Sequence, residues 1–385
     1  MNKLATLDLH EDTDPVDDLV LALSMARGLD EVMAAVRSRV RSLVGADGIS
    51  FVLRDGDKCY YADEDAITPL WKGQRFPADS CISGWAMKHR EVVTIEDIYA
   101  DDRIPHAAYR PTFVKSLAMV PVRLEDPVAA IGAYWARRHQ PTFSEIAILK
   151  RVANSAAVAM TNVSLIEALV DAKEEAVRAK DAIIFAMASL AEARDNETGN
   201  HIHRTQYYVQ ALAEAASAAY PDQLDQRTID LLFKCAPLHD VGKVGIPDAI
   251  LLKPGKLDPD EYAIMKTHAE KGRFAIEAAE KKLGPSEFLK LAKEIAWTHH
   301  ERWDGAGYPR GIAGNDIPLA GRLMAIADVY DALVSKRCYK QAIPHDEAVD
   351  IIAHERGKQF DPVLVDVFLK IAPQFDAIHR EFVDT

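Results

Sequence analysis

The sequence predicts a multidomain protein with an N-terminal α+β domain, a long connecting helix and an all-α C-terminal domain. Two observations lead to this prediction. Short β-branched and aromatic runs separated by turn residues are confined to roughly the first 150 residues, whereas helical periodicity continues through the remainder. The chain has 385 residues, which is enough for two or three domains of about 100–200 residues each.

Composition and charge narrow the class of protein. Lys and Arg total 46 and Asp and Glu total 59, so the formal net charge is −13. Basic patches dominate binding to polymeric nucleic acid and to anionic membranes, so this balance disfavours both partners. The four cysteines form no C-x-x-C pair, the N-terminus soon turns acidic, and no apolar run approaches the about 18–20 residues of a membrane span. We therefore expect a cytoplasmic protein with reduced thiols.

The N-terminal domain is expected at residues 17–157, after an acidic leader at residues 1–16. Its first element is predicted as one amphipathic helix from Val16 to Val44. The turn sequence Arg54-Asp-Gly-Asp57 then predicts a hairpin loop between two strands. The predicted strands are Ile49–Leu53, Lys58–Tyr61, Glu91–Ile95, Ser116–Val122 and Ala129–Trp135.

A long helix is predicted from Thr142 onward. Within it, apolar residues recur in alternating steps of four and three, with a single polar member. This seam consists of Val158, Asn162, Leu165, Leu169, Ala172, Ala176, Ala179, Ile183, Ala186 and Leu190. It predicts a parallel two-stranded coiled coil over residues 158–190, which would make the protein a homodimer. A single amphipathic helix packed on its own domain is the alternative.

The C-terminal domain is expected at residues 191–385 and reads as helices separated by Gly and Pro breaks. One start is well marked, because Asp258 can cap a helix whose first residues are Pro259, Asp260 and Glu261. The predicted helices are Leu224–Ala236, Asp260–Leu283, Ser286–His299, Leu319–Ser335, Asp346–Ala353 and Pro362–Ile371.

Imidazole and carboxylate residues gather in this C-terminal half beside the helix breaks. They are Glu197, His201, His239, Asp240, His268, His299, His300 and Asp328. A structural tetrahedral metal site takes about four ligands, so this set is too large for one such site. It suffices for two or three metal ions that share bridging carboxylates, an arrangement used for phosphoryl displacement. Ligands without thiolate favour iron or manganese among the divalent first-row metals.

The order of these blocks is similar to that of the HD-GYP family. The blocks are Glu197-Thr-Gly-Asn-His201, His239-Asp240-Val-Gly-Lys243, His268, His299-His300-Glu301, Gly305-x-Gly307-Tyr308-Pro309 and Asp328-x2-Asp331. The family consists of metal-dependent phosphodiesterases of cyclic di-GMP. The resemblance therefore implies hydrolysis of cyclic di-GMP to linear pGpG, and it leaves open whether the product is cleaved further to GMP.

The resemblance also assigns roles to individual residues. It implies that the eight imidazole and carboxylate residues above are metal ligands, that Asp240 bridges two ions, and that a hydroxide between the ions attacks phosphorus. In the family, a Glu at the place that Glu197 occupies in this sequence accompanies a third metal ion.

The resemblance implies substrate contacts as well. It places Arg337 and Lys340 at the phosphates and Lys243 within reach of a phosphate or of the metal-bound hydroxide, where their positive charge would oppose the negative charge that develops in the transition state. The alternative for Arg337 and Lys340 is a solvated helix end, where cations are also favourable. Tyr308 could stack on guanine or donate to a phosphate, while its loop could equally be a structural cap over His299 and His300.

The N-terminal domain resembles a GAF domain. The likeness lies in Asp79-Ser-Cys81-Ile-Ser-Gly84-Trp85, Val93-Thr-Ile95, Asp102-Arg-Ile-Pro105, Ser116–Val122 and Gly132-Ala-Tyr134-Trp135. Such domains bind small molecules or only dimerise, so the resemblance implies regulation of the C-terminal domain while the GAF ligand is unknown. The aromatic residues Trp85, Tyr134 and Trp135 are expected in the core rather than at a ligand.

Two other functions stay open at this point. The same metal chemistry could act on another cyclic or linear dinucleotide, or the chain could be a catalytically silent module that binds a cyclic dinucleotide. The remaining histidines are interpreted as structural or surface residues: His10, His89, His106, His139, His203, His345, His354 and His379.

Overall fold

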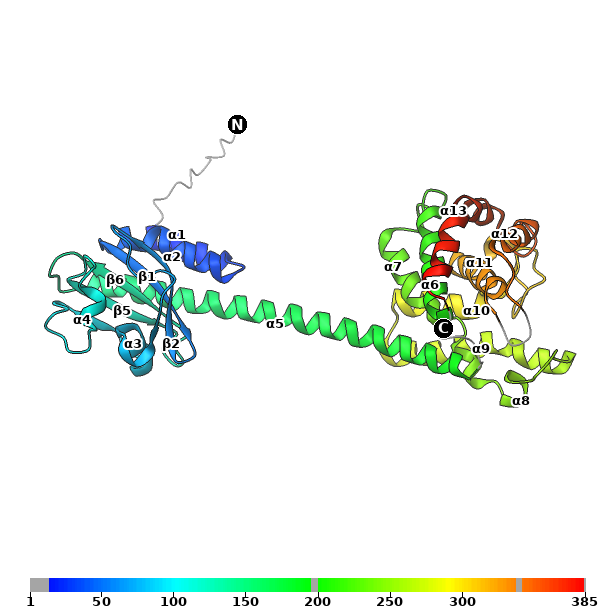
Figure 1. Ribbon diagram of the computed structural model, residues 1–385, viewed down its shortest axis with the longest axis horizontal. Coiled ribbons are helices and arrows are strands. Elements are labelled where there is room, and N and C mark those ends of the chain that lie inside the picture. The colour runs from blue at the N-terminus through cyan, green and yellow to red at the C-terminus, as the bar shows by residue number, and fades with distance from the viewer. Residues whose placement is uncertain (1–13, 195–199, 337–340, 384–385) are drawn as a thin grey trace, which may run out of the picture. The chain divides into compact units, whose positions relative to one another are not determined.

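The computed structural model of the protein describes residues 14–194, 200–336 and 341–383. The chain divides into two compact units, Met1–Glu174 and Glu175–Thr385 (Figure 1). The expected order of an α+β domain, a long helix and an all-α domain is confirmed.

The first unit is built on one antiparallel sheet of six strands in the order β3-β2-β1-β6-β5-β4. The five predicted strands are present, and the short β3, which the sequence analysis missed, pairs with β2. The strands are β1 Gly48–Asp55, β2 Lys58–Ala66, β3 Arg75–Pro77, β4 Val93–Ile95, β5 Ser116–Val122 and β6 Ala129–Trp135.

Helices cover both faces of this sheet. On one face, α1 (Pro15–Met25), α2 (Leu29–Leu43) and the first turns of α5 (Phe143–Ala193) pack in one apolar cluster with inward side chains of β1, β5 and β6. On the other face, α3 (Ile82–His89) and α4 (His106–Tyr109) pack in a second cluster that holds Cys59 and Cys81. Alternate residues of β5 therefore enter different clusters, as the period of two in a strand requires.

The prediction of one helix from Val16 to Val44 is wrong. Two helices fill this stretch, and the chain leaves α1 at Ala26 and enters α2 at Gly28, both in extended backbone conformations. The apolar period continues on both sides of the break, and for that reason the break was missed.

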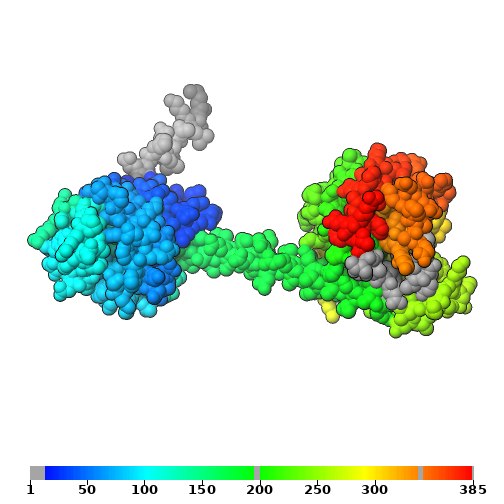
Figure 2. Space-filling view, viewed as in Figure 1, coloured from blue at the N-terminus to red at the C-terminus, as the bar shows by residue number. Residues whose placement is uncertain are grey.

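The long helix α5 carries the predicted apolar seam. Every residue from 164 to 180 is exposed, and in the space-filling view the middle of α5 is bare on the face shown (Figure 2). Among the large apolar residues that the structure describes, several seam residues are strongly exposed, including Leu165 at 63% and Leu169 at 70%.

Part of helix α5 is as apolar as a membrane-spanning helix. By length and composition alone it could cross a bilayer, since an 18-residue window within it has a hydropathy of 1.3 and is 28% buried. One such helix is weak evidence for a span. The expectation of no membrane contact stays a prediction.

The second unit is a helical domain around one large apolar core, with a smaller separate cluster at Ile246, Ile250 and Leu251. Here α6 packs on α7, α11 and α13, and α10 packs on α7, α9 and α11. Its helices are the end of α5, α6 Asn200–Ala216, α7 Gln226–Cys235, α8 Asp248–Leu251, α9 Pro259–Leu283, α10 Glu287–Thr298, α11 Leu319–Val334, α12 His345–His354 and α13 Pro362–Glu381. The predicted capping box at Asp258 is confirmed, while α13 runs ten residues beyond its predicted end at Ile371 and contains Pro373.

Candidate metal centre

Seven of the sequence-predicted ligands meet in two groups within the second unit. In each group, one ligand atom from every residue lies within 4.8 Å of the others. The first group is Asp240, His268, His299 and His300, and the second is His201, His239 and Asp328. They come from α6, the turn after α7, α9, the end of α10 and α11.

The turn after α7 delivers His239 and Asp240. Helix α7 ends at Cys235, and two short 3-10 turns follow, Ala236–Leu238 and Val241–Gly245. His239 and Asp240 lie between these turns, and in the second turn Gly242 packs against α9 so closely that a Cβ atom there would lie 1.9 Å from the carbonyl oxygen of His268. Glycine is therefore required, since this close approach brings His268 beside Asp240.

The loop after α10 holds His299 and His300 in place. Glu301 is buried, and its carboxylate accepts hydrogen bonds from the backbone N–H groups of Arg310 and Ile312 at 2.8 and 3.2 Å. This contact folds the loop back on itself. Gly307 sits inside the fold, where a Cβ would lie 2.3 Å from the backbone nitrogen of Arg302. The resulting loop brings the Tyr308 ring onto His300, with ring centroids 4.7 Å apart.

The backbone fixes the orientation of three of the imidazole rings. Nδ1 of His239, His268 and His299 lies 2.8–3.0 Å from a backbone carbonyl oxygen one turn earlier. A carbonyl oxygen can only accept, so each Nδ1 carries the proton, and in the neutral ring Nε2 is left with a bare lone pair. This tautomer is the one that binds a metal ion through Nε2.

The bare nitrogen of His299 faces other electron-rich atoms. Its Nε2 lies 3.5 Å from Nε2 of His268 and 3.5 Å from Oδ1 of Asp240. Burial, partly offset by Asp240, lowers the pKa of His299, so this ring is neutral. Oδ1 of Asp240 is buried and accepts no hydrogen bond from any described residue. Lone pairs that face each other in a buried site repel unless a cation lies between them, so these residues fit a metal ion.

Asp240 lies between the two groups with one oxygen toward each. Its Oδ2 is 3.3 Å from Nε2 of His239, and its Oδ1 is 3.2 Å from Nε2 of His268. The Lys243 ammonium lies 2.7 Å from Oδ2. Burial opposes ionisation of Asp240, but Lys243 and the imidazoles outweigh it and hold the pKa of this carboxyl well below its usual value. The carboxylate is therefore ionised and can serve two ions.

Burial and neighbouring charges also shift the pKa values of His300 and His239. Burial, reinforced by His299 and His268, holds the pKa of His300 well below that of a free imidazole. Burial acts in the same direction on His239, but there the Asp240 carboxylate outweighs it and raises the pKa. Metal binding to His239 would release any proton that its Nε2 carries, because a ligating imidazole nitrogen must be deprotonated.

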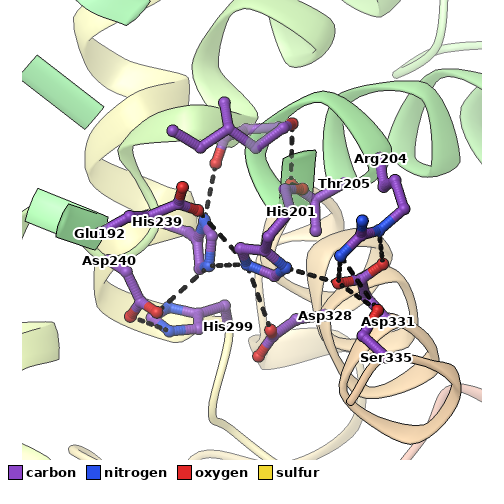
Figure 3. A network of polar contacts seen from close by, with 12 residues as sticks. Glu192, His201, Arg204, Thr205, His239, Asp240, His299, Asp328, Asp331 and Ser335 are labelled. Carbon is purple, nitrogen blue, oxygen red and sulfur yellow. Dashed lines mark hydrogen bonds and ion pairs between the residues drawn. The ribbon is translucent and has the colours of Figure 1, made fainter. Parts of the chain in front are cut away.

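His201 is held from its far side by a buried ion pair. Its Nδ1 lies 2.7 Å from Oδ2 of Asp331, whose carboxylate accepts from Nε and Nη2 of Arg204 at 2.6 and 3.0 Å. In Figure 3, His201 lies between His239 and this Asp331–Arg204 pair. Burial disfavours the Asp331 carboxylate, but His201 and Arg204 more than compensate and lower its pKa. Asp331 therefore orients His201 with Nε2 toward His239, 3.5 Å away.

A carboxylate that the sequence analysis missed reaches the second group from α5. Glu192 is only 6% exposed, and its Oε1 lies 3.9 Å from Nε2 of His201 (Figure 3). The sequence does carry a signal for it. Ala188 and Ala191 are also buried, so Glu192 occupies the apolar face of the last turn of α5. The reasoning that singled out Asp328, an acid on an apolar helix face, applies equally to Glu192.

Three predicted site residues, Glu197, Arg337 and Lys340, lie outside the described residues. Of the histidines that were set aside, His203 turns away from both groups and stacks on Phe382, with ring centroids 5.8 Å apart.

Two family models match the chain in separate segments. A GAF domain model matches residues 26–161, and an HD domain model matches residues 186–364.

Curated relatives match part of the chain. A probable cyclic di-GMP phosphodiesterase of Vibrio cholerae is 55% identical over 210 residues, which cover 54% of this chain and 48% of that protein. A cyclic di-GMP phosphodiesterase of the same organism is 53% identical over 229 residues, covering 59% and 46%. Its 3'3'-cGAMP-specific phosphodiesterase 2 is 42% identical over 202 residues, covering 52% and 37%. The chain thus spans half or less of the length of these relatives.

Proposed function

Because this chain carries a GAF domain and an HD domain, we propose that it is a metal-dependent phosphodiesterase that hydrolyses cyclic di-GMP to linear pGpG. The observation that carries the proposal is the approach of neutral His299 Nε2 to the buried Oδ1 of Asp240, because these two atoms need a cation between them.

The two groups of ligands divide the metal binding between them. Asp240 would serve both groups, since it directs Oδ1 to His268 and Oδ2 to His239. Bound ions supply Lewis acidity and a water molecule of lowered pKa at such a centre. Iron or manganese suits the imidazole and carboxylate donors, and a third ion is expected if Glu197 joins the second group.

Lys243 adds positive charge beside this centre. Its ammonium is 2.7 Å from Asp240, and its side chain is 13% exposed, so it can exchange part of this contact for a phosphate oxygen of the substrate. A cation held at that place stabilises the negative charge that grows on phosphorus oxygens during displacement. Arg337 and Lys340 are proposed to contact phosphate as well, on the HD-GYP resemblance.

The relatives support cyclic di-GMP as the preferred substrate. One of them is named a cyclic di-GMP phosphodiesterase and another a probable one, and both are more similar to this chain than the 3'3'-cGAMP-specific relative. The direct test is to assay metal-loaded protein on cyclic di-GMP, 3'3'-cGAMP and pGpG side by side. We expect the highest kcat/KM on cyclic di-GMP. A higher value on another dinucleotide would reassign the substrate, and binding without turnover of any would indicate a silent binding module.

The GAF domain is proposed to regulate this centre through α5. The same helix carries the exposed apolar seam and, in its last turn, Glu192 beside His201. We propose that the seam pairs with that of a second copy in a cytoplasmic homodimer. Leu in place of Ala172, Ala176 and Ala179 should tighten the dimer and shift basal turnover. A tighter dimer with unchanged turnover would make α5 a simple tether.

A further inference from the structure

An exposed aromatic ring and a lysine lie side by side on α9, next to the first ligand group. Tyr262 and Lys266 are four residues apart and therefore share one face of the helix. The Lys266 ammonium lies 5.2 Å from the centroid of the Tyr262 ring and 5.9 Å from that of Tyr308. Tyr262 is 48% exposed, so much of its ring is open to solvent.

These side chains form a continuous row from the metal groups to the surface. Tyr308 stacks on His300 at 4.7 Å, and its ring is 6.5 Å from that of Tyr262, edge to face. The row therefore runs His300, Tyr308, Tyr262, with Lys266 over both tyrosines. A ligand with one end at the first ligand group could extend along these side chains and contact Tyr262 with its other end.

The charge of Lys266 has no acidic partner in the described part of the chain, where its recorded contacts are the two rings. The Lys266 ammonium is therefore not neutralised by a carboxylate beside the two rings. An ammonium with free donors beside a half-exposed ring matches a nucleotide, which presents a phosphate and a base together.

We propose that Tyr262 and Lys266 form a purine nucleotide subsite, in which Tyr262 stacks on a base and Lys266 contacts the phosphate that is not being cleaved. The inference rests on the proposed function, since it concerns the part of a cyclic dinucleotide that lies outside the metal centre. Tyr262 thereby determines specificity for substrates with a base at this position, and Lys266 contributes charge.

The chain offers a matched control for this subsite. In the first unit, Lys115 lies 5.1 Å from the centroid of the Tyr99 ring, and Tyr99 is 42% exposed. The pair Tyr99–Lys115 has the same chemistry and similar exposure, but it belongs to the GAF domain. Tyr99→Ala and Lys115→Met should therefore leave binding at the metal centre unchanged.

The experiment measures the KM for cyclic di-GMP with metal-loaded full-length protein and its Kd with metal-free protein, where no turnover occurs. For Tyr262→Ala we expect both constants to rise roughly five- to hundredfold, since base–aromatic stacking is lost, with kcat and metal content unchanged. Tyr262→Phe should restore tight binding because it keeps the ring. Lys266→Met should raise both constants and weaken their dependence on salt.

The outcomes separate this inference from the proposed function. Wild-type turnover with unchanged constants in Tyr262→Ala would overturn the subsite and leave the phosphodiesterase in place. Binding that is lost in Tyr262→Ala, without turnover by the wild type, would support the subsite and overturn the phosphodiesterase. A wild-type protein that neither binds nor cleaves cyclic di-GMP would overturn both.

Discussion

The two units bury different kinds of polar group, and the difference indicates where a cation is required. In the first unit the buried groups are mostly hydroxyls and thiols that hydrogen-bond to one another. Ser50 pairs with Tyr134 at 2.8 Å, and Ser83 contacts both Tyr61 and Cys81 at 3.2 and 3.3 Å. Each of these groups can donate and accept, so the cluster largely satisfies itself.

The second unit buries imidazoles and carboxylates instead. Neutral His299 and ionised Asp240 both present lone pairs, 3.5 Å apart, and neither can donate to the other. An arrangement of acceptors without donors is costly in a buried site. The buried acceptors of the second unit therefore indicate a metal ion, whereas the buried hydroxyls and thiols of the first unit do not indicate any ligand.

The largest effect is expected for Asp240→Asn. The amide cannot bridge two ions as a carboxylate does, so turnover should fall on the order of a thousandfold, and the metal content of the purified protein should drop. The matched control is Asp63→Asn in the first unit, where the buried Asp63 pairs with Lys72 at 2.6 Å. Metal analysis should show no loss there. If Asp240→Asn kept its full metal content, the buried carboxylate of the second unit would be no more important for metal binding than that of the first.

Breaking the ion pair behind His201 should cost stability as well as metal affinity. Asp331→Asn removes the Asp331 carboxylate from the fully buried Arg204, and loss of one partner of a buried pair costs about 3–5 kcal/mol in the free energy of unfolding. Metal affinity should fall about 10–100-fold, because His201 loses its orienting partner. Denaturant unfolding and metal titration measure the two effects.

The control for this variant is Asp366→Asn. Asp366 also accepts two hydrogen bonds from one guanidinium, that of Arg356, both at 2.8 Å, but the pair is half exposed. Exposed pairs contribute about 0–1 kcal/mol. Equal losses in Asp331→Asn and Asp366→Asn would show that burial is not the cause.

A smaller effect is expected for Glu192→Gln in the last turn of α5. The carboxylate near His201 is exchanged for a neutral amide of the same size, so metal affinity of the second group should fall about tenfold. Glu175→Gln, on an exposed part of the same helix, should have no effect. Metal titration of both variants checks this. Equal affinities in the two variants would show that Glu192 of α5 does not contribute to metal binding.

Much of the fold follows from local patterns in the sequence, and its exceptions have physical causes. β5 and β6 were predicted to the residue because both ends are marked by changes of residue type. The break at Gly28 was missed because the apolar period resumes after it. Helix α13 passes Pro373, which local rules take as an end, because tertiary packing of Phe375 and Ile378 holds its later turns.

The residues of the two groups could be singled out as candidate ligands because their residue types are costly in a core without a cation, as for Asp328. Contacts that depend on tertiary neighbours could not. Asp331 was noted only as part of a motif, since its role needs Arg204 and His201 from α6 beside it. Tyr262 could not be predicted as a site residue, because its proximity to the site depends on the fold of the loop that carries Tyr308.

The last prediction concerns thiol chemistry in the first unit, where Cys59 and Cys81 are buried together. A hydrogen bond from Cys59 and the N–H groups of Ser83 and Gly84 at the start of α3 lower the pKa of Cys81 to about 6, despite its burial. The shared hydrogen bond and burial raise the pKa of Cys59 far above its usual value. The thiolate is the reactive form, so alkylation of Cys81 by a small reagent should increase from pH 5 to 7 and then level off.

Cys59 and Cys235 provide the comparison, because burial also raises the pKa of Cys235. Both should stay unmodified over this pH range when sites are mapped by mass spectrometry. Since Cys81 is 7% exposed, its rate will be slow, but the midpoint of its pH profile reports the pKa and not the access. A midpoint near that of an ordinary thiol, about 8.5, would show that Cys59 and the α3 N-terminus do not stabilise the Cys81 thiolate. The hydroxyl and thiol cluster of the first unit would then be neutral throughout, and its contrast with the charged centre of the second unit would be complete.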